Sequence, residues 1–234
     1  MSTGLSNESV AGVLLRLRVH PRARRLRLRF DEKHGGLTLT VPPRMSRREA
    51  LAWAAEQSEW VVAQLARQPA MMPLAPEATI PLNGEDIRLV WTEGASRIVT
   101  RSPGALGCGG ARDAFERRIE AWLQQFARDT LSQETRRIAE VAGVTVTAVS
   151  VGDAGSRWGS CSASGAIRYS WRLILAPPDV RRYVVAHEVA HRLHMDHGDA
   201  FKATETRLYG GSVSSARLLL RRLSPVLRRV GRGV

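Results

Sequence analysis

The chain has 234 residues, a hydrophobic fraction of 44% and a formal net charge of +13. This length suffices for one sizeable core, or for a small accessory domain beside a larger one. No apolar run approaches the roughly 20 residues of a membrane span, and the first ten residues lack a secretory signal, so we expect a cytoplasmic protein without membrane association. Cys108 and Cys161 lie far apart without CxxC spacing, which fits a reducing compartment and argues against a cysteine-ligated zinc.

Arginine carries almost all of the positive charge, since Lys33 and Lys202 are the only lysines. Such an excess predicts attraction to the phosphates of nucleic acid. A G+C-rich coding sequence would produce the same excess, so composition alone does not separate binding from codon bias. We therefore expect a weak nucleic-acid association at most.

The first segment with a clear period is Val13 to Phe30, where apolar residues alternate with arginines. A period of two predicts strands with one buried face and one arginine-lined face. We expect two strands paired through the turn at His20 and Pro21, followed by a third strand from Leu37 to Val41. The arginine rows fit either a solvated outer face or a binding surface.

A capping box at Ser46 and Glu49 predicts the start of a helix that runs to Arg67. A proline-containing linker follows, and then a strand from Ile87 to Trp91. The glycine-rich run 101–110 lacks the spacing of a phosphate-binding loop and is interpreted as a plain loop.

The second half of the chain reads as a long helix, two strands and three further helices. Phe115 begins an amphipathic helix toward Gly143, with an interruption expected near Ser132. The remaining expected elements are strands at 144–151 and 166–171, a turn-rich segment at 156–161, a helix capped by Asp179, a helix at 199–208 and a basic leucine-rich helix at 213–230.

The chemistry is concentrated in the segment from Val184 to Phe201. His187, Glu188 and His191 form an HExxH pattern, which on a helix places two imidazoles on one face, about one turn apart. Both rings can then bind one ion, with Glu188 beside the metal as general base. A third protein ligand would leave one tetrahedral position open for water, as in catalytic zinc sites.

His197 is the expected third ligand, because it follows His191 at the spacing seen in metzincins. Those enzymes have a glycine at the position of His194, so we expect a turn within residues 194–196 that uses positive φ angles. His194 and Glu205 remain alternatives for the third ligand. The sequence thus predicts one Zn²⁺ per chain.

A longer set of residues resembles one family. The set is Arg157-Trp158-Gly159-Ser160-Cys161, Trp171-Arg172-Leu173, Ala176-Pro177, Tyr183-Val184-Val185 and the HExxH segment ending at His197 and Phe201. This order is similar to the YgjP-like zinc metallopeptidases, relatives of the SprT-like proteases. The resemblance implies an α+β fold with a zincin-like core, a small sheet and the HExxH helix, preceded by an antiparallel β-rich part. We expect domains at 1–100, with the Ser46 to Arg67 helix, and at 111–234, with the basic C-terminal helix.

The resemblance implies a zinc-dependent peptidase that acts on a protein or peptide, with no obligate partner. For substrate or transition-state contacts, proximity in sequence suggests Arg157, Tyr169, Tyr183 and Arg168. Two other functions stay open: a metal-dependent nucleotide phosphohydrolase, and a non-enzymatic zinc protein associated with nucleic acid.

Overall fold

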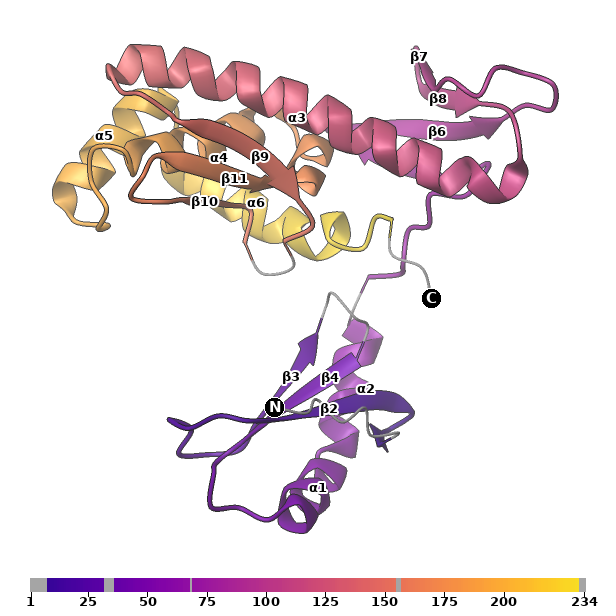
Figure 1. Ribbon diagram of the computed structural model, residues 1–234, viewed down its shortest axis with the longest axis vertical. Coiled ribbons are helices and arrows are strands. Elements are labelled where there is room, and N and C mark those ends of the chain that lie inside the picture. Colours follow the sequence, from indigo (N-terminus) through magenta and orange to yellow (C-terminus); the bar gives the residue numbers. More distant parts are fainter. Residues whose placement is uncertain (1–7, 32–35, 68, 155–156, 232–234) are drawn as a thin grey trace. The chain divides into compact units, whose positions relative to one another are not determined.

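The computed structural model describes residues 8–31, 36–67, 69–154 and 157–231 (Figure 1). The chain forms two compact units, Met1–Pro69 and Ala70–Gly233, here called the N-terminal unit and the C-terminal unit. Each unit has its own hydrophobic core. The division falls earlier in the chain than the expected boundary at 100–111, because the sheet formed by residues 79–108 packs into the core of the C-terminal unit.

The N-terminal unit contains a sheet with the order β1-β2-β4-β3. Its strands are β1 (Ser9–Val10), β2 (Val13–Val19), β3 (Arg27–Asp31) and β4 (Gly36–Val41). The antiparallel pairs are β1 with β2 and β3 with β4, whereas β2 and β4 run parallel. The expected direct pairing of β2 with β3 is wrong, because β4 lies between them. The threonines of β4 thus separate two arginine-bearing strands that would otherwise place like charges opposite each other.

Two helices, α1 (Arg47–Glu56) and α2 (Ser58–Arg67), replace the expected single helix. The capping box is confirmed, since the Ser46 hydroxyl accepts from the Glu49 backbone N–H and the Glu49 carboxylate accepts from the Ser46 N–H. The break falls at Gln57, where the Ser58 hydroxyl donates to the carbonyl of Ala55 and competes with the helical backbone bonds.

The C-terminal unit begins with a second four-stranded sheet of order β5-β6-β8-β7. Its strands are β5 (Thr79–Leu82), β6 (Glu85–Trp91), β7 (Thr100–Ser102) and β8 (Ala105–Cys108). The interpretation of residues 101–110 as a plain loop is therefore wrong. Leu106 and Cys108 alternate with small residues and are buried, so the segment has the period of a strand despite its glycines.

A 28-residue helix, α3 (Phe115–Ala142), packs against the rest of this unit (Figure 1). It passes Ser132 without the expected interruption and ends at Gly143, whose φ of 67° is left-handed. One face of the helix is buried along its whole length, from Phe115 to Ala139. This apolar face explains why one polar serine does not break the helix.

A three-stranded sheet, order β10-β11-β9, lies beside α3. Its strands are β9 (Ala148–Gly152), β10 (Gly159–Cys161) and β11 (Ala166–Ser170); β9 is parallel and β10 antiparallel to β11. The 3₁₀ segment η2 (Trp171–Leu175) leads to α4 (Pro178–Ala190), α5 (Asp199–Tyr209) and α6 (Val213–Leu227). The whole is an α+β fold, as expected. Among the described residues, no helix combines the length and apolar character needed to cross a bilayer.

Candidate metal centre

Helix α4 carries the HExxH residues and is buried on most of its surface. It begins at Pro178 after Pro177, so the expected cap by Asp179 is wrong: proline occupies the first helical turn, where no N–H partner is needed. The turn between β5 and β6 holds this end of the helix. The Asn83 side chain accepts from Arg181, and a Cβ added at Gly84 would lie 3.0 Å from Pro177.

His187 and His191 project from one side of α4, with ring centroids 5.0 Å apart. His197 comes from the segment between α4 and α5, and its ring centroid lies 5.2 Å from that of His187. One nitrogen from each of the three rings falls within 4.8 Å of the others. The buried ring of Phe201 lies against all three imidazoles, with centroid distances of 4.6 to 5.1 Å.

The segment that returns His197 to α4 does so without the expected positive φ angles. Among the described residues other than glycine, only Ala11, Glu77 and Asn83 have positive φ. Successive backbone bonds to the carbonyls of residues 189 and 190 tighten the end of α4, and the Asp196 carboxylate accepts from the Gly198 N–H. An Asx-type turn therefore replaces the glycine-dependent turn.

The spacing of the imidazole nitrogens fits a single metal ion. The Nε2 atoms of His187 and His197 lie 3.4 Å apart. Two ligands at about 2.0–2.1 Å from a tetrahedral zinc ion are separated by about 3.3 Å. The distance thus agrees with two ligands of one ion, and neutral imidazoles are the form that binds zinc.

The opposite edges of two rings are fixed by hydrogen bonds. His187 Nδ1 lies 2.7 Å from Glu205 Oε1, and His191 Nδ1 lies 3.0 Å from the carbonyl oxygen of His194. A carboxylate and a carbonyl only accept, so each Nδ1 carries the proton and each Nε2 keeps its lone pair. Burial lowers the pKa of His187, with Glu205 opposing this effect, which favours the neutral ring.

Glu205 is thus placed behind a candidate ligand and outside the group of three. Its carboxylate is buried, with one oxygen on His187 Nδ1 and the other 3.3 Å from Arg217 Nη2. Arg217 Nε also donates to the Tyr183 hydroxyl at 3.1 Å. A chain of contacts therefore runs from α6 through α5 to a candidate ligand on α4, in the arrangement that orients metal-binding histidines.

Glu188, the residue after His187, points toward strand β10. A Cβ added at Gly159 would lie 2.5 Å from Glu188 Oε1, so only glycine leaves room for this carboxylate. Burial raises the pKa of Glu188 to about 7, and the positive charge of Arg157 acts in the opposite direction. A carboxylate with a pKa near neutrality is suited to accept and return a proton.

Comparison with known proteins decides the family. The model of the YgjP-like metallopeptidase domain matches residues 24–222, most of the chain. The chain belongs to the YgjP-like metallopeptidase family. A metal-dependent peptidase activity, and hence a peptide substrate, follows from this membership.

One solved structure, the metallopeptidase zymogen abylysin of Pyrococcus abyssi, is 16% identical with a TM-score of 0.37; the match covers 43% of this chain and 97% of that chain. A comparison with curated proteins gave no match.

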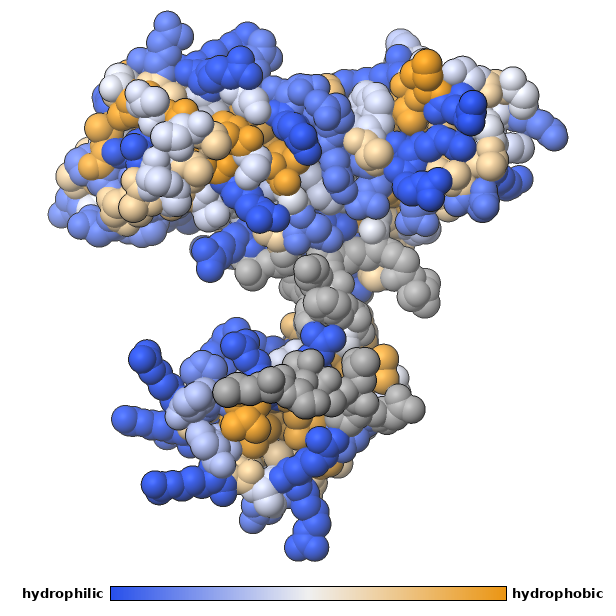
Figure 2. Space-filling view, in the orientation of Figure 1, coloured by the Kyte–Doolittle hydropathy of each residue, from blue (hydrophilic) through white to orange (hydrophobic). Residues whose placement is uncertain are grey.

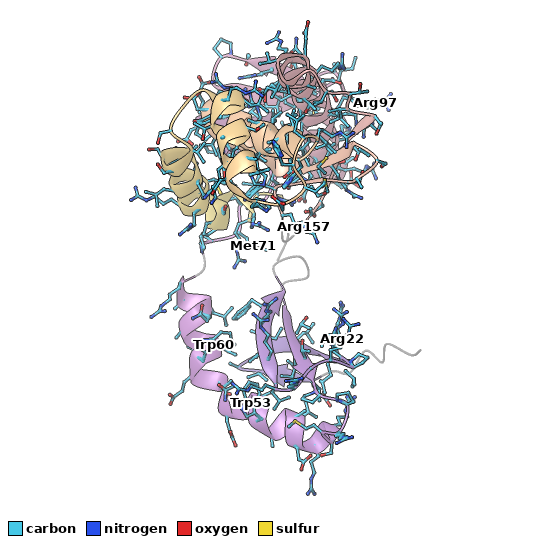
Figure 3. All side chains as sticks on the ribbon, turned by 90° about the vertical axis from the view of Figure 1, so that its left-hand side faces the viewer. Arg22, Trp53, Trp60, Met71, Arg97 and Arg157 are labelled. Atoms are coloured by element: carbon cyan, nitrogen blue, oxygen red, sulfur yellow. The ribbon has the colours of Figure 1, made fainter. Side chains whose placement is uncertain are left out.

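The remaining candidates in this YgjP-like protein have separate positions. Tyr169 is fully buried with its hydroxyl 3.0 Å from Thr135, so it is out of reach of a substrate. Tyr183 is buried and bonded to Arg217. Arg157 is exposed (Figure 3) and its charge acts on Glu188. Arg168 pairs with Ser160, next to Gly159 on β10, and so projects from the sheet face opposite to Glu188.

Two residues of the site were not found from the sequence. Arg217 is one of several arginines in a basic helix, and nothing in that pattern distinguishes it. Gly159 lies in a segment interpreted as a turn, where a glycine carries no sign of a packing role. Glu205 was considered as a ligand. A glutamate at this helical position can either bind the metal or orient a metal-binding histidine, and the sequence does not distinguish the two.

Proposed function

We propose that this protein is a zinc-dependent metallopeptidase in which His187, His191 and His197 hold the ion and Glu188 is the general base. The observation that carries the proposal is the convergence of three imidazole nitrogens, two of them with their tautomer fixed for binding. An all-imidazole set of three ligands with an open fourth position is typical of catalytic zinc. When bound, the ion would acidify a water molecule and polarise the scissile carbonyl.

Glu188 would take the proton from the attacking water and deliver it to the leaving amine. Its place beside β10 supports this role, because the carboxylate lies next to the strand where a substrate is expected. Arg157 is our candidate for stabilising the developing negative charge, since it is exposed and close enough for its charge to act on Glu188.

Strand β10 supplies an edge to which an extended peptide can add. The Ser170 N–H donates to the Trp158 carbonyl and the Ser162 N–H to the Ala166 carbonyl. In an antiparallel ladder, the residues between these bonded positions point their backbone groups the other way. Gly159 and Cys161 therefore direct theirs to the open edge, where the described residues provide no backbone partner. Addition of a substrate strand there would bring its carbonyls past Glu188.

The test is the Glu188→Gln variant, loaded with zinc and assayed against casein and a fluorogenic peptide library. We expect wild-type zinc content by elemental analysis and a loss of hydrolysis of about 10²- to 10⁴-fold, because the amide keeps the shape but not the base. Hydrolysis near the wild-type rate with zinc bound would refute the mechanism. Nucleoside triphosphates are assayed in parallel, and their cleavage with no peptide cleavage would favour the phosphohydrolase alternative.

A further inference from the structure

Four arginines of the N-terminal unit occupy one face of its sheet in register. On β2 and β3 they flank two threonines of the central strand β4. The two rows are Arg16–Thr38–Arg29 and Arg18–Thr40–Arg27. Directly opposite residues share a face of the sheet, so the six side chains form one surface, here called the arginine face.

The arginine face is the solvent side of the sheet. Its opposite side buries Leu15, Leu37 and Leu39 in the core of the unit. The four arginines are exposed and the two threonines are half-buried. Figure 3 shows Trp60 on the helical side of the sheet and Arg22, from the β2–β3 connection, on the other. Figure 2 shows hydrophilic side chains projecting far from this unit.

The charge of the arginine face is not compensated within the described part of the unit. None of its four arginines has a hydrogen-bond or ion-pair partner among the described residues, whereas Arg47 of the same unit pairs with Glu8. The segment from Ser9 to Phe30 contains seven arginines and no acidic residue.

Codon bias does not account for this imbalance. The same bias acts on α3 (Phe115–Ala142), which contains five arginines but also five acidic residues. Arginines are thus balanced along α3 and unbalanced along β2 and β3. What distinguishes the first strands is the scarcity of acids, since β2 and β3 carry four arginines and one acidic residue, Asp31. An excess of arginine codons does not by itself produce this scarcity.

The four arginines of the arginine face lie close enough together to act on one polyanion. Neighbouring strands lie about 4.8 Å apart and alternate residues about 7 Å apart, so the four guanidinium stems define a rectangle of about 10 by 7 Å. Both lengths are comparable to the Debye length, which is about 10 Å at 0.1 M salt and about 8 Å at 0.15 M, so the four charges act together on a bound anion. Guanidinium groups bind phosphate through two parallel hydrogen bonds, and threonine hydroxyls also donate to phosphate oxygens.

We propose that the arginine face binds the phosphodiester backbone of nucleic acid without reading base sequence. The six residues of the face include no aromatic side chain, so base stacking does not contribute. Leu14, near the start of β2, is exposed and is a single apolar side chain. Insertion into a membrane surface requires an extended apolar face, so a membrane is a poorer match. The repeated phosphates of a polynucleotide match the charge and the donors present.

The test titrates the full-length protein into a fluorescein-labelled DNA duplex of mixed sequence, and into one of its single strands, with anisotropy as the readout. For about four phosphate contacts, the logarithm of the affinity for duplex should fall with the logarithm of salt with a slope of about −3 to −4. The variant Arg16→Gln/Arg18→Gln/Arg27→Gln/Arg29→Gln should lose at least about tenfold in affinity at about 50 mM salt and most of this slope.

The matched control replaces four exposed arginines of α3, Arg117, Arg128, Arg136 and Arg137, by glutamine. Both variants lower the net charge from +13 to 13 − 4 = +9, so only the position of the charges differs. We expect less than about threefold loss for the control. The half variants, Arg16→Gln/Arg18→Gln and Arg27→Gln/Arg29→Gln, should each remove about half of the salt slope, a graded result that misfolding would not give.

Three results would overturn the proposal. An equal loss in the α3 control would mean that binding follows total charge. Absence of DNA binding at about 50 mM salt, where phosphate contacts are strong, would show that the arginine face does not bind nucleic acid. Polyglutamate or phosphatidylserine vesicles that bind through the same four arginines as tightly as DNA would show that the face recognises an acidic protein segment or a membrane surface instead.

Discussion

His187 Nδ1 and Glu205 Oε1 lie 2.7 Å apart, although the two residues belong to different helices. The contact orients a ring whose other nitrogen lies 3.4 Å from His197 Nε2. Because Glu205 is itself held by Arg217, the position of a candidate metal ligand depends on α5 and α6 as well as on α4. The packing of α5 and α6 against α4 therefore helps to orient the imidazole of His187.

Replacing Glu205 should weaken metal binding without removing a ligand. We expect Glu205→Gln to lower zinc affinity about tenfold and Glu205→Ala up to about a hundredfold, since residues behind metal-binding histidines typically contribute 10- to 100-fold. Competition with a chromogenic chelator measures the affinity directly, apart from any assay of hydrolysis. Arg207→Gln, an exposed residue of the same helix, is the control and should keep wild-type affinity. Unchanged affinity in Glu205→Ala would contradict the orienting role.

The choice of third ligand is tested by two single substitutions in the segment after α4. His197→Ala should lose most of the bound zinc, because it removes one of three converging nitrogens. His194→Ala should retain it, because His194 contributes its backbone carbonyl to His191 and its side chain is outside the group. Elemental analysis after dialysis distinguishes them, and the reverse pattern would reassign the ligand.

Gly159→Ala should impair catalysis while leaving metal content unchanged. The added Cβ would lie 2.5 Å from Glu188 Oε1, so the carboxylate has to move away from its position. A displacement of about 1 Å at a catalytic group is enough to cost about a hundredfold in rate. Ser160→Ala, on the opposite face of the same strand, serves as the control and should stay close to wild type. Equal rates for Gly159→Ala and wild type would show that Glu188 tolerates the shift.

In the metal-free protein, the contribution of Glu188 to the free energy of unfolding should fall as the pH rises. Burial raises its pKa from the ordinary value of 4.5 to about 7, so the folded state favours the protonated carboxyl. Its stabilising contribution is complete below pH 4.5 and is lost as the pH rises through about 7.

Relative to wild type, metal-free Glu188→Gln should therefore gain on the order of 3 kcal/mol by pH 8 and little at pH 5. Chemical denaturation of the two proteins at these pH values measures the difference. A constant difference between them would mean that Glu188 does not titrate in this range.

The sequence was sufficient to predict which residues of α4 form the candidate metal site. It was not sufficient to predict which residues of other elements contact their side chains. The HExxH spacing depends on helical periodicity alone, so the placement of His187 and His191 follows from local rules. The role of Glu205 depends on the angle between α4 and α5, which no local pattern encodes. The same limit applies to β4, since its position between β2 and β3 depends on contacts across the sheet and not on the local pattern of any one strand.

Local signals also failed where a weak preference was overridden by packing. Ser132 and the glycines around Leu106 favour loops in isolation, but both segments present a buried apolar row to the core. Asp179 is a good capping residue, yet the two preceding prolines begin α4 two residues earlier, with Pro177 as the N-cap. Tertiary burial decides the first two cases because it exceeds the propensity of a single residue, whereas the start of α4 is set by its prolines.

The contacts of α4 with Asn83 at one end and, through Glu205, with Arg217 at the other set the order in which the site can be completed during synthesis. A ribosome releases the β5–β6 turn early and the three histidines much later, and α6 follows them. Contacts between such distant segments form late in folding, because the intervening loop must close first. Full hydrolytic competence would then arrive only once α6 has left the ribosome.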